Sequence, residues 1–276
     1  MSARTAGEAR GPVARVGAAR LAWSFFRVSA MNELHYRANF FIQLAQSLLA
    51  LGTGLVALAL VFSRTDDLDG WSQAELLVVM GVFTIMGGVI RSAIQPNMQR
   101  LLQDIRQGTL DFTLTKPADA QLLVSVREVH IWQGVDVLTG LIVLAVAMTR
   151  LEDGASAGDL LAFIAMSGLG AVMIYCFWLM IATGAFWLVR MDEVNELFHG
   201  VYRAGQYPVG VYPGWLRIGL TFLVPLAFAV TVPSEAVTSR LGWDTVALAA
   251  AVALVLVVVS RAFWRLGVRH YSGASA

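Results

Sequence analysis

The chain has 276 residues, of which 57% are hydrophobic and 14% are charged, and its formal net charge is +1. Soluble proteins carry about 25% charged residues, so this composition excludes an ordinary soluble domain and indicates a membrane protein. The single cysteine excludes a disulfide framework and a cysteine-rich metal site. Because the net charge is close to zero, the positions of the charges are more informative than their sum.

Six long apolar stretches run through the sequence. Each is close to or longer than the ~20 residues that cross the hydrocarbon core of a bilayer as a helix. Of the 20 Lys and Arg residues, all but Arg64, Arg150 and Arg240 lie in the two terminal segments, in alternate gaps between the stretches, or at the span ends next to them. Positive residues stay on the cytoplasmic side, so both termini are expected there. The expected spans are residues 39–62, 73–94, 129–149, 160–189, 216–233 and 245–264.

The segment before the first span divides into two parts. Residues 1–12 are small and polar and contain Gly and Pro, which predicts a disordered tail. Residues 13–36 carry an apolar stripe flanked by arginines, which predicts an interfacial helix along the inner leaflet. The fold class is therefore all-α, and residues 13–276 are expected to form a single six-span membrane domain.

The gap after the second span has the clearest pattern. Pro96 can begin a helix, and Gly108 can end it in a left-handed conformation. Leu110, Phe112 and Leu114 then alternate with polar residues, which predicts an extended segment. The apolar face of the predicted helix consists of Met98, Leu101, Leu102 and Ile105.

This amphipathic helix has two interpretations. It could rest on the lipid surface, or it could dock onto a cytoplasmic partner. Its mixed charges favour docking, because a lipid-binding helix is usually more uniformly basic. The gap after the fourth span carries Glu193 and Glu196, and these acids belong either to a solvated loop or to a second partner contact.

Polar residues within the spans are candidates for a substrate pathway. Asp136 could bind a cationic substrate or accept hydrogen bonds from a neighbouring helix. Gln43, Gln46 and Tyr175 could line a pathway or make interhelical contacts and packing. Small residues in the second and fourth spans indicate close helix contacts. They are Thr84, Gly87, Gly88, Ser167, Gly168 and Gly170.

The sequence contains no motif for covalent or nucleotide chemistry. HExxH and the Gly-x4-Gly-Lys-Ser/Thr loop do not occur, and no plausible Ser-His-Asp order is found. An ATP-driven process would therefore need a separate ATPase chain. An ion-coupled secondary transporter or channel is an alternative function, but inverted repeats are not evident. A membrane-bound enzyme is a further alternative, disfavoured because no reactive cluster is found.

Two motifs resemble those of a known family. The stretch from Ile105 to Pro117, IRQGTLDFTLTKP, resembles a signature of one group of ABC-2 type transporter permeases. The stretch QYPVGVYP from Gln206 to Pro213, followed by Pro225 and Pro233, is similar to a second feature of that group. The resemblance extends from about Trp23 to the sixth span.

The resemblance implies a six-span permease subunit of an ATP-driven exporter in the cell (inner or plasma) membrane. Two permease subunits, identical or related, would pair in the lipid bilayer, and separate ATPase subunits would bind ATP and Mg. No cofactor is expected in this chain, and nucleic acid is not an expected partner. Such permeases often have re-entrant helices before the last span, for which residues 233–244 leave little room.

The same resemblance assigns the helix between spans two and three to coupling, because in this family it sits in a groove of the ATPase. The expected coupling residues are Met98, Leu101, Leu102, Ile105, Arg106, Gly108, Asp111, Glu193 and Glu196.

Overall fold

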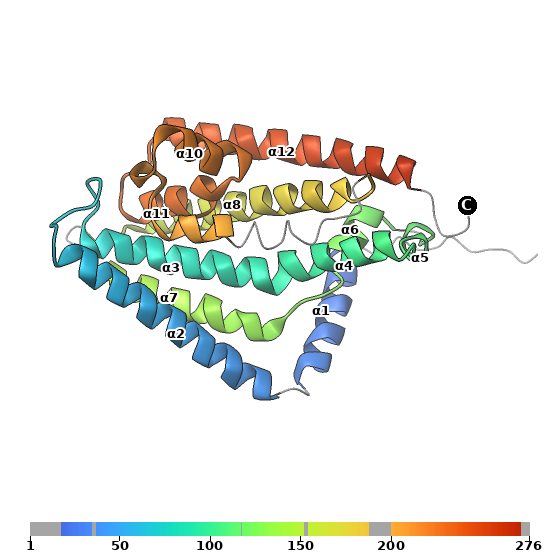
Figure 1. Ribbon diagram of the computed structural model, residues 1–276, viewed down its shortest axis with the longest axis horizontal. Helices are drawn as coiled ribbons and strands as arrows, with labels where there is room; N and C mark the ends of the chain where they lie inside the picture. Colours follow the sequence, from blue (N-terminus) through green and yellow to red (C-terminus); the bar gives the residue numbers. More distant parts are fainter. Residues whose placement is uncertain (1–17, 35–36, 117, 152–153, 188–199, 272–276) are drawn as a thin grey trace, which may run out of the picture.

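The computed structural model describes residues 18–34, 37–116, 118–151, 154–187 and 200–271, and this part of the chain is all-helical (Figure 1). Five helices are long and apolar enough to cross a membrane, and by length and composition a bent helix pair is either a broken sixth span or a re-entrant loop. The predicted disordered tail, Glu193 and Glu196 lie outside the described residues.

The long helices lie side by side in the order α12, α8, α3, α7 and α2 (Figure 1). Their bounds are Arg37–Phe62 for α2, Gln73–Val89 for α3, Gly134–Met148 for α7, Ala157–Gly184 for α8 and Trp243–His270 for α12. Helix α3 continues through a π turn, Ile90–Ile94, into α4, Gln95–Arg106, as one helix of 34 residues. The shorter helices near this end are α1 (Ala18–Leu34), α5 (Asp111–Leu114) and α6 (Ala120–Ser125).

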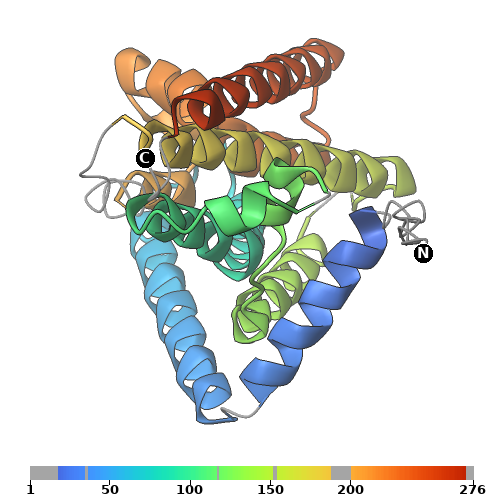
Figure 2. The same cartoon turned by 90° about the vertical axis from the view of Figure 1, so that its right-hand side faces the viewer.

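The bundle has two distinct ends. The α4 end carries α4, α5, α6 and the end of α12. Viewed from this end in Figure 2, α4 to α6 lie between the α8–α12 layer and the helices α7 and α2. The opposite end, called the Glu75 end here, carries the loop before α3, the turn after α7 and the turn before α12.

Two helices begin with side-chain caps at the Glu75 end. The hydroxyl of Ser72 accepts the backbone N–H of Glu75, and the Glu75 carboxylate accepts the backbone N–H of Ser72. Ser156 and Asp159 form the same reciprocal pair at the start of α8. These capping boxes satisfy N–H groups that would otherwise lack partners, and they fix where α3 and α8 begin.

The π turn is explained by Pro96. A proline inside a helix cannot donate to the carbonyl four residues earlier, which here is that of Ser92. The Ser92 carbonyl instead accepts the N–H of His130 at 2.8 Å, from the segment before α7. The prediction that Pro96 begins a separate helix was therefore wrong: α4 continues the second span.

Gly108 ends α4 with φ +68°, which confirms the predicted left-handed termination. The extended segment predicted after it is wrong, because residues Asp111–Leu114 form the single turn α5. Leu110 and Leu114 are spaced for one helical face, and the Leu110 carbonyl accepts the N–H groups of Thr113 and Leu114. Leu110 could be buried in either a helical or an extended segment, so its burial alone does not distinguish the two. The hydrogen bonds accepted by its carbonyl show that the segment is helical.

Helices α3 and α7 approach closely at glycines. A Cβ at Gly88 would lie 2.7 Å from a methyl of Val137, and one at Gly140 would lie 2.7 Å from the backbone N of Ile85. Small residues allow such backbone contact between membrane helices. Gly88 was predicted to make such a contact, whereas the role of Gly140 was not anticipated.

Helix α8 makes a second close contact. A Cβ at Gly170 would lie 2.5 Å from the carbonyl oxygen of Phe228 and 2.6 Å from Cα of Ala229. This confirms the contact predicted for Gly170. The same prediction is wrong for Gly168, which has no neighbouring atom within 4 Å of its Cβ position.

The fifth predicted span, 216–233, is not a straight helix. Residues Gly214–Leu223 and Ala227–Val237 form two arms bent by 75°. The bend follows from Pro225, because the residue before a proline is driven out of the helical region, and Val224 is extended. The first arm comprises α10 (Gly214–Ile218) and a π turn, and the second ends in α11 (Val232–Val237).

Both outer ends of this bent pair lie at the Glu75 end. Gly210, just before the first arm, packs against the carboxylate of Asp69, and Val237 lines a pocket with Ser72. The start of the second arm, just after the bend, contacts α8 at Gly170. The pair therefore enters and leaves from one end, as a re-entrant hairpin does, and the straight crossing predicted for this segment was wrong.

The segment between the fourth and fifth predicted spans was expected on the cytoplasmic side. Its described residues just after position 200 lie inside the bundle instead. Tyr202 donates a hydrogen bond to the carbonyl of Phe83 at 2.8 Å and stacks on its ring at 4.7 Å. Gly205 also lies beside Phe83. Since Phe83 lies about 15 Å along α3 from Gln73, these residues are inside the bundle at mid-height.

Candidate functional site

A cavity of about 520 Å³ opens inside the bundle at this mid-height. Helix α2 forms one wall, α3 forms the second, and the segment 202–207 forms the third. Its volume lies within the roughly 300–1,000 Å³ of typical small-molecule sites. The lining residues used below are Leu51, Leu58, Leu76, Met80, Arg91, Asp136, Arg203 and Tyr207.

An ion pair closes the α4 side of this cavity. Nη2 of Arg91, in the π turn, donates to Oδ2 of Asp136 at 2.7 Å, and Nε2 of Gln43 donates to the same oxygen at 3.0 Å. The Asp136 side chain is 6% exposed and that of Arg91 is 35% exposed. A buried carboxylate needs such partners, and this one joins α2, α3 and α7 through a single group.

The four predicted pathway residues are only partly brought together. Asp136 lines the cavity and Gln43 bonds to it, whereas Gln46 is exposed on another side of α2. Tyr175 lies elsewhere, where its hydroxyl contacts the Ser125 hydroxyl at 2.7 Å. Arg91 was expected among the cytoplasmic charges, although its position just over one turn before Pro96 was a signal for a local break in the helix.

The segment after α6 is fastened to α4 by buried polar groups. Asn97 accepts the N–H groups of Arg127 and Glu128 and donates to the Glu128 carbonyl. Asp104 pairs with Arg127 at 2.5 Å and with Arg100 at 3.4 Å. Because Asn97 and Asp104 are buried, these bonds hold α4 and the start of α7 as one unit.

Helix α1 is fastened to the same region. The Glu33 carboxylate accepts the N–H groups of Ile131 and Trp132, and the Trp132 indole donates to the Glu33 carbonyl at 3.1 Å. An acidic side chain at the beginning of a helix also interacts favourably with the helix dipole. Sequence periodicity could not reveal this long-range cap.

Helix α6 is tied to α12 by Arg261, whose guanidinium pairs with Asp119 and donates to Gln121 at 2.6 Å. This pairing, aided by the backbone N–H of Leu122, holds the pKa of Asp119 below its ordinary value. The carboxylate therefore stays ionised near neutral pH and keeps the α6–α12 contact.

The apolar stripe of α4 is not available for docking. Met98 is 0% exposed and Leu101 is 1% exposed, and Leu102 is also buried in the core of this chain. The prediction that these side chains contact an ATPase is therefore corrected, because amphipathic periodicity marks a buried face without identifying what buries it. Ile105 is half-buried against the same core.

The exposed surface at this end lies on the turn beyond α4. Phe112 is 75% exposed, and Arg106 and Lys116 are also exposed. Gly108 and Asp111 lie between them in the chain and are half-buried. This set is called the Phe112 surface below; it combines one large apolar ring with basic side chains.

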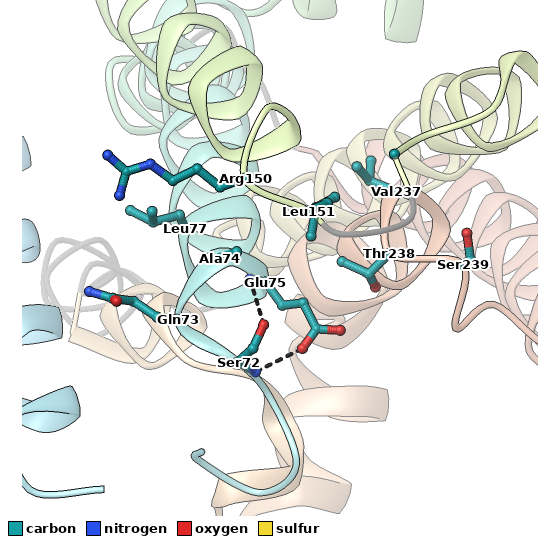
Figure 3. A pocket seen from close by; sticks show the side chains of 11 residues that line it. Ser72, Gln73, Ala74, Glu75, Leu77, Arg150, Leu151, Val237, Thr238 and Ser239 are labelled. Atoms are coloured by element: carbon teal, nitrogen blue, oxygen red, sulfur yellow. Dashed lines mark hydrogen bonds between the residues drawn. The ribbon is translucent and has the colours of Figure 1, made fainter. Parts of the chain in front are cut away.

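A second pocket, of about 540 Å³, lies at the Glu75 end. Figure 3 shows Ser72 and Glu75 joined by their capping bonds, with Leu151 and Thr238 also lining the pocket. The Glu75 carboxylate also accepts two hydrogen bonds from Arg240, whose guanidinium lies 4.8 Å above the Trp71 ring. These bonds hold the start of α3 against the turn that connects the re-entrant hairpin to α12.

In the described residues, no group of three His, Cys, Asp or Glu side chains is arranged to hold a metal ion. What the geometry offers is a cavity within apolar helices, bordered by an ion pair. The long apolar helices are those of a multi-pass membrane protein.

Residues 48–275 match the family described as ABC-2 family transporter protein. The match covers well over half of the chain, which therefore belongs to the ABC-2 type permease family. The chain is a membrane permease of an ABC transporter, that is, a transport subunit that is not itself catalytic. No curated protein and no solved structure matches it.

The Asp136 contact predicts different consequences for two glutamines of α2. Gln43→Leu removes a hydrogen bond to a buried charged group and is expected to lower the free energy of unfolding by about 1.5–3 kcal/mol. Gln46→Leu is the matched control and is expected to change it by less than about 0.5 kcal/mol, because Gln46 is exposed. Thermal unfolding of the purified chain in one detergent would measure both, and equal effects would contradict the assignment.

Proposed function

We propose that this chain forms the translocation pathway of an ATP-driven exporter, as a homodimer or with a related permease, and that separate ATPase subunits bind ATP and Mg. The observation that carries this proposal is the continuity of α3, the π turn and α4. One helix runs from the α4 end to the Arg91–Asp136 pair at the cavity. Movement at the docking end would therefore be transmitted to the cavity wall.

In this proposal the ATPase contacts the Phe112 surface rather than the apolar stripe of α4. Exposed aromatic and Arg side chains are enriched at protein interfaces, whereas fully buried residues cannot reach a partner. The network around Asn97 and Asp104 supports transmission, since it makes α4 and the start of α7 move together. Closure of paired ATPases on ATP would then shift α3 and α7 as a unit.

The orientation follows from charge. The α4 end carries most of the described basic residues, so it faces the cytoplasm, and the Glu75 end faces outward. Residues 13–276 then form one membrane domain in the inner or plasma membrane, with α1 along the inner leaflet. Export is supported by the family resemblance of the Ile105–Pro117 and Gln206–Pro213 motifs.

Within this pathway Asp136 is the counter-ion of Arg91 rather than a ligand for a cationic substrate. Its accepting oxygen already receives two donors, one of them charged. A cation entering the cavity would have to displace the Arg91 guanidinium from its only described carboxylate partner.

Docking is tested by comparing two aspartate substitutions. Phe112→Asp is expected to leave a stable membrane protein and to reduce ATPase association at least about tenfold, because loss of one aromatic hot spot costs about 2 kcal/mol or more. Leu101→Asp is expected to abolish stable protein, because it buries an unpaired carboxylate in the core of this chain. Yield, monodispersity and ATPase co-purification separate the two cases. Normal association of Phe112→Asp would contradict the docking surface.

Orientation is tested with single cysteines in a Cys176→Ala background. Asp66→Cys is expected to react with an impermeant thiol reagent in intact cells, and Gln107→Cys is expected to react only after the cells are opened. Both positions are exposed, and neither has the positive φ found at Gly70 and Gly108. Labelling of position 107 from outside would reverse the orientation.

A further inference from the structure

An arginine borders the cavity, and its role as described below rests on the proposed function of this chain as a permease. Arg203 is exposed and follows Tyr202, which is buried against Phe83 at mid-height of α3. Arg203 is therefore an exposed cation about 15 Å from the start of α3, well inside a ~30 Å hydrocarbon layer. An arginine at this depth faces a water-filled cavity or a charged partner and marks a functional site.

Among the described lining residues, the charge balance of the cavity is positive. Its charged lining residues are Arg91, Asp136 and Arg203. Arg91 and Asp136 neutralise each other in the 2.7 Å ion pair. Within the described ranges Arg203 has no ion pair, so one positive charge remains in the lining of the cavity. A net positive cavity with low-dielectric walls favours anions over cations.

The remaining lining divides into an apolar and a polar part. Leu51, Leu58, Leu76 and Met80 present hydrocarbon from α2 and α3 toward the Glu75 end. Tyr207 adds an aromatic ring with a hydroxyl on the same wall as Arg203. A ligand that fits this distribution has a hydrocarbon body and one acidic group.

We propose that the cavity takes an amphiphile with a carboxylate or phosphate head, and that Arg203 binds the head. A guanidinium holds such groups through two parallel hydrogen bonds, which a cationic or neutral amphiphile cannot form. The apolar wall of α2 and α3 holds the tail. A phospholipid of the surrounding bilayer keeps its phosphate at the membrane surface, so the ligand is a molecule drawn into the cavity.

The test uses three dansyl probes with the full chain in phosphatidylcholine nanodiscs. The probes are 11-(dansylamino)undecanoic acid as the anion, its methyl ester as the neutral compound and dansylcadaverine as the cation. Protein-free nanodiscs give the background from partitioning into lipid. The parent chain is expected to bind the acid more tightly than the ester, and the ester at least as tightly as the cation.

The variants are Arg203→Gln, Arg203→Lys and the control Arg217→Gln, which removes an exposed arginine of α10 outside the cavity. Arg203→Gln is expected to weaken binding of the acid about tenfold or more and to leave the ester unchanged, because a charge-assisted hydrogen bond is lost. Arg203→Lys keeps the charge and should lose less than Arg203→Gln. Arg217→Gln should bind all three probes as the parent does.

An unchanged ratio of acid to ester affinity in Arg203→Gln would overturn the proposal. Loss of acid binding when phosphatidylglycerol is added to the nanodiscs would also overturn it, by showing that a bilayer lipid occupies Arg203. Because binding is measured without ATPase, a permease that fails to associate with an ATPase would contradict the docking proposal alone. A complex that associates and hydrolyses ATP but shows no charge preference would contradict the substrate class alone.

Discussion

The carboxylate of Asp136 is the constraint on which the arrangement of the bundle depends. An ionised group at this position in a membrane protein must be paired, and the partners come from two other helices. Arg91 reaches it from the π turn and Gln43 reaches it from α2. The π turn exists because Pro96 leaves the Ser92 carbonyl without its helical donor. Pro96, near the end of the second span, thus produces the π turn from which Arg91 reaches Asp136.

The position of the ion pair connects the two functional regions. Arg91 belongs to the same continuous helix as α4, and Asp136 follows directly on the segment fastened to α4 by Asn97. π turns occur frequently at functional sites, where they accommodate an interruption without ending the helix. Force applied beyond α4 would act on both partners of the pair, and the cavity lies immediately beside them.

Local patterns predicted most of the elements, whereas long-range contacts had to come from the structure. Helix lengths and the stop at Gly108 follow from apolar runs and backbone freedom. The role of Met98 and Leu101 was misassigned because periodicity shows that a face is buried but not whether the same chain buries it. The re-entrant hairpin resembles a span in composition, and only the contacts of Gly210 and Val237 place both of its ends together.

The central claim is that α3, the π turn and α4 act as one lever. It is tested most directly by the distance between spin labels at Gln73 and Gln103, two exposed positions on this helix. At 1.5 Å per residue the helix positions are about 45 Å apart. The account predicts one narrow distribution near this value, unchanged between the nucleotide-free complex and the vanadate-trapped complex with ATPase. A second, shorter population on trapping would show that the helix bends at the π turn, and it would contradict the claim.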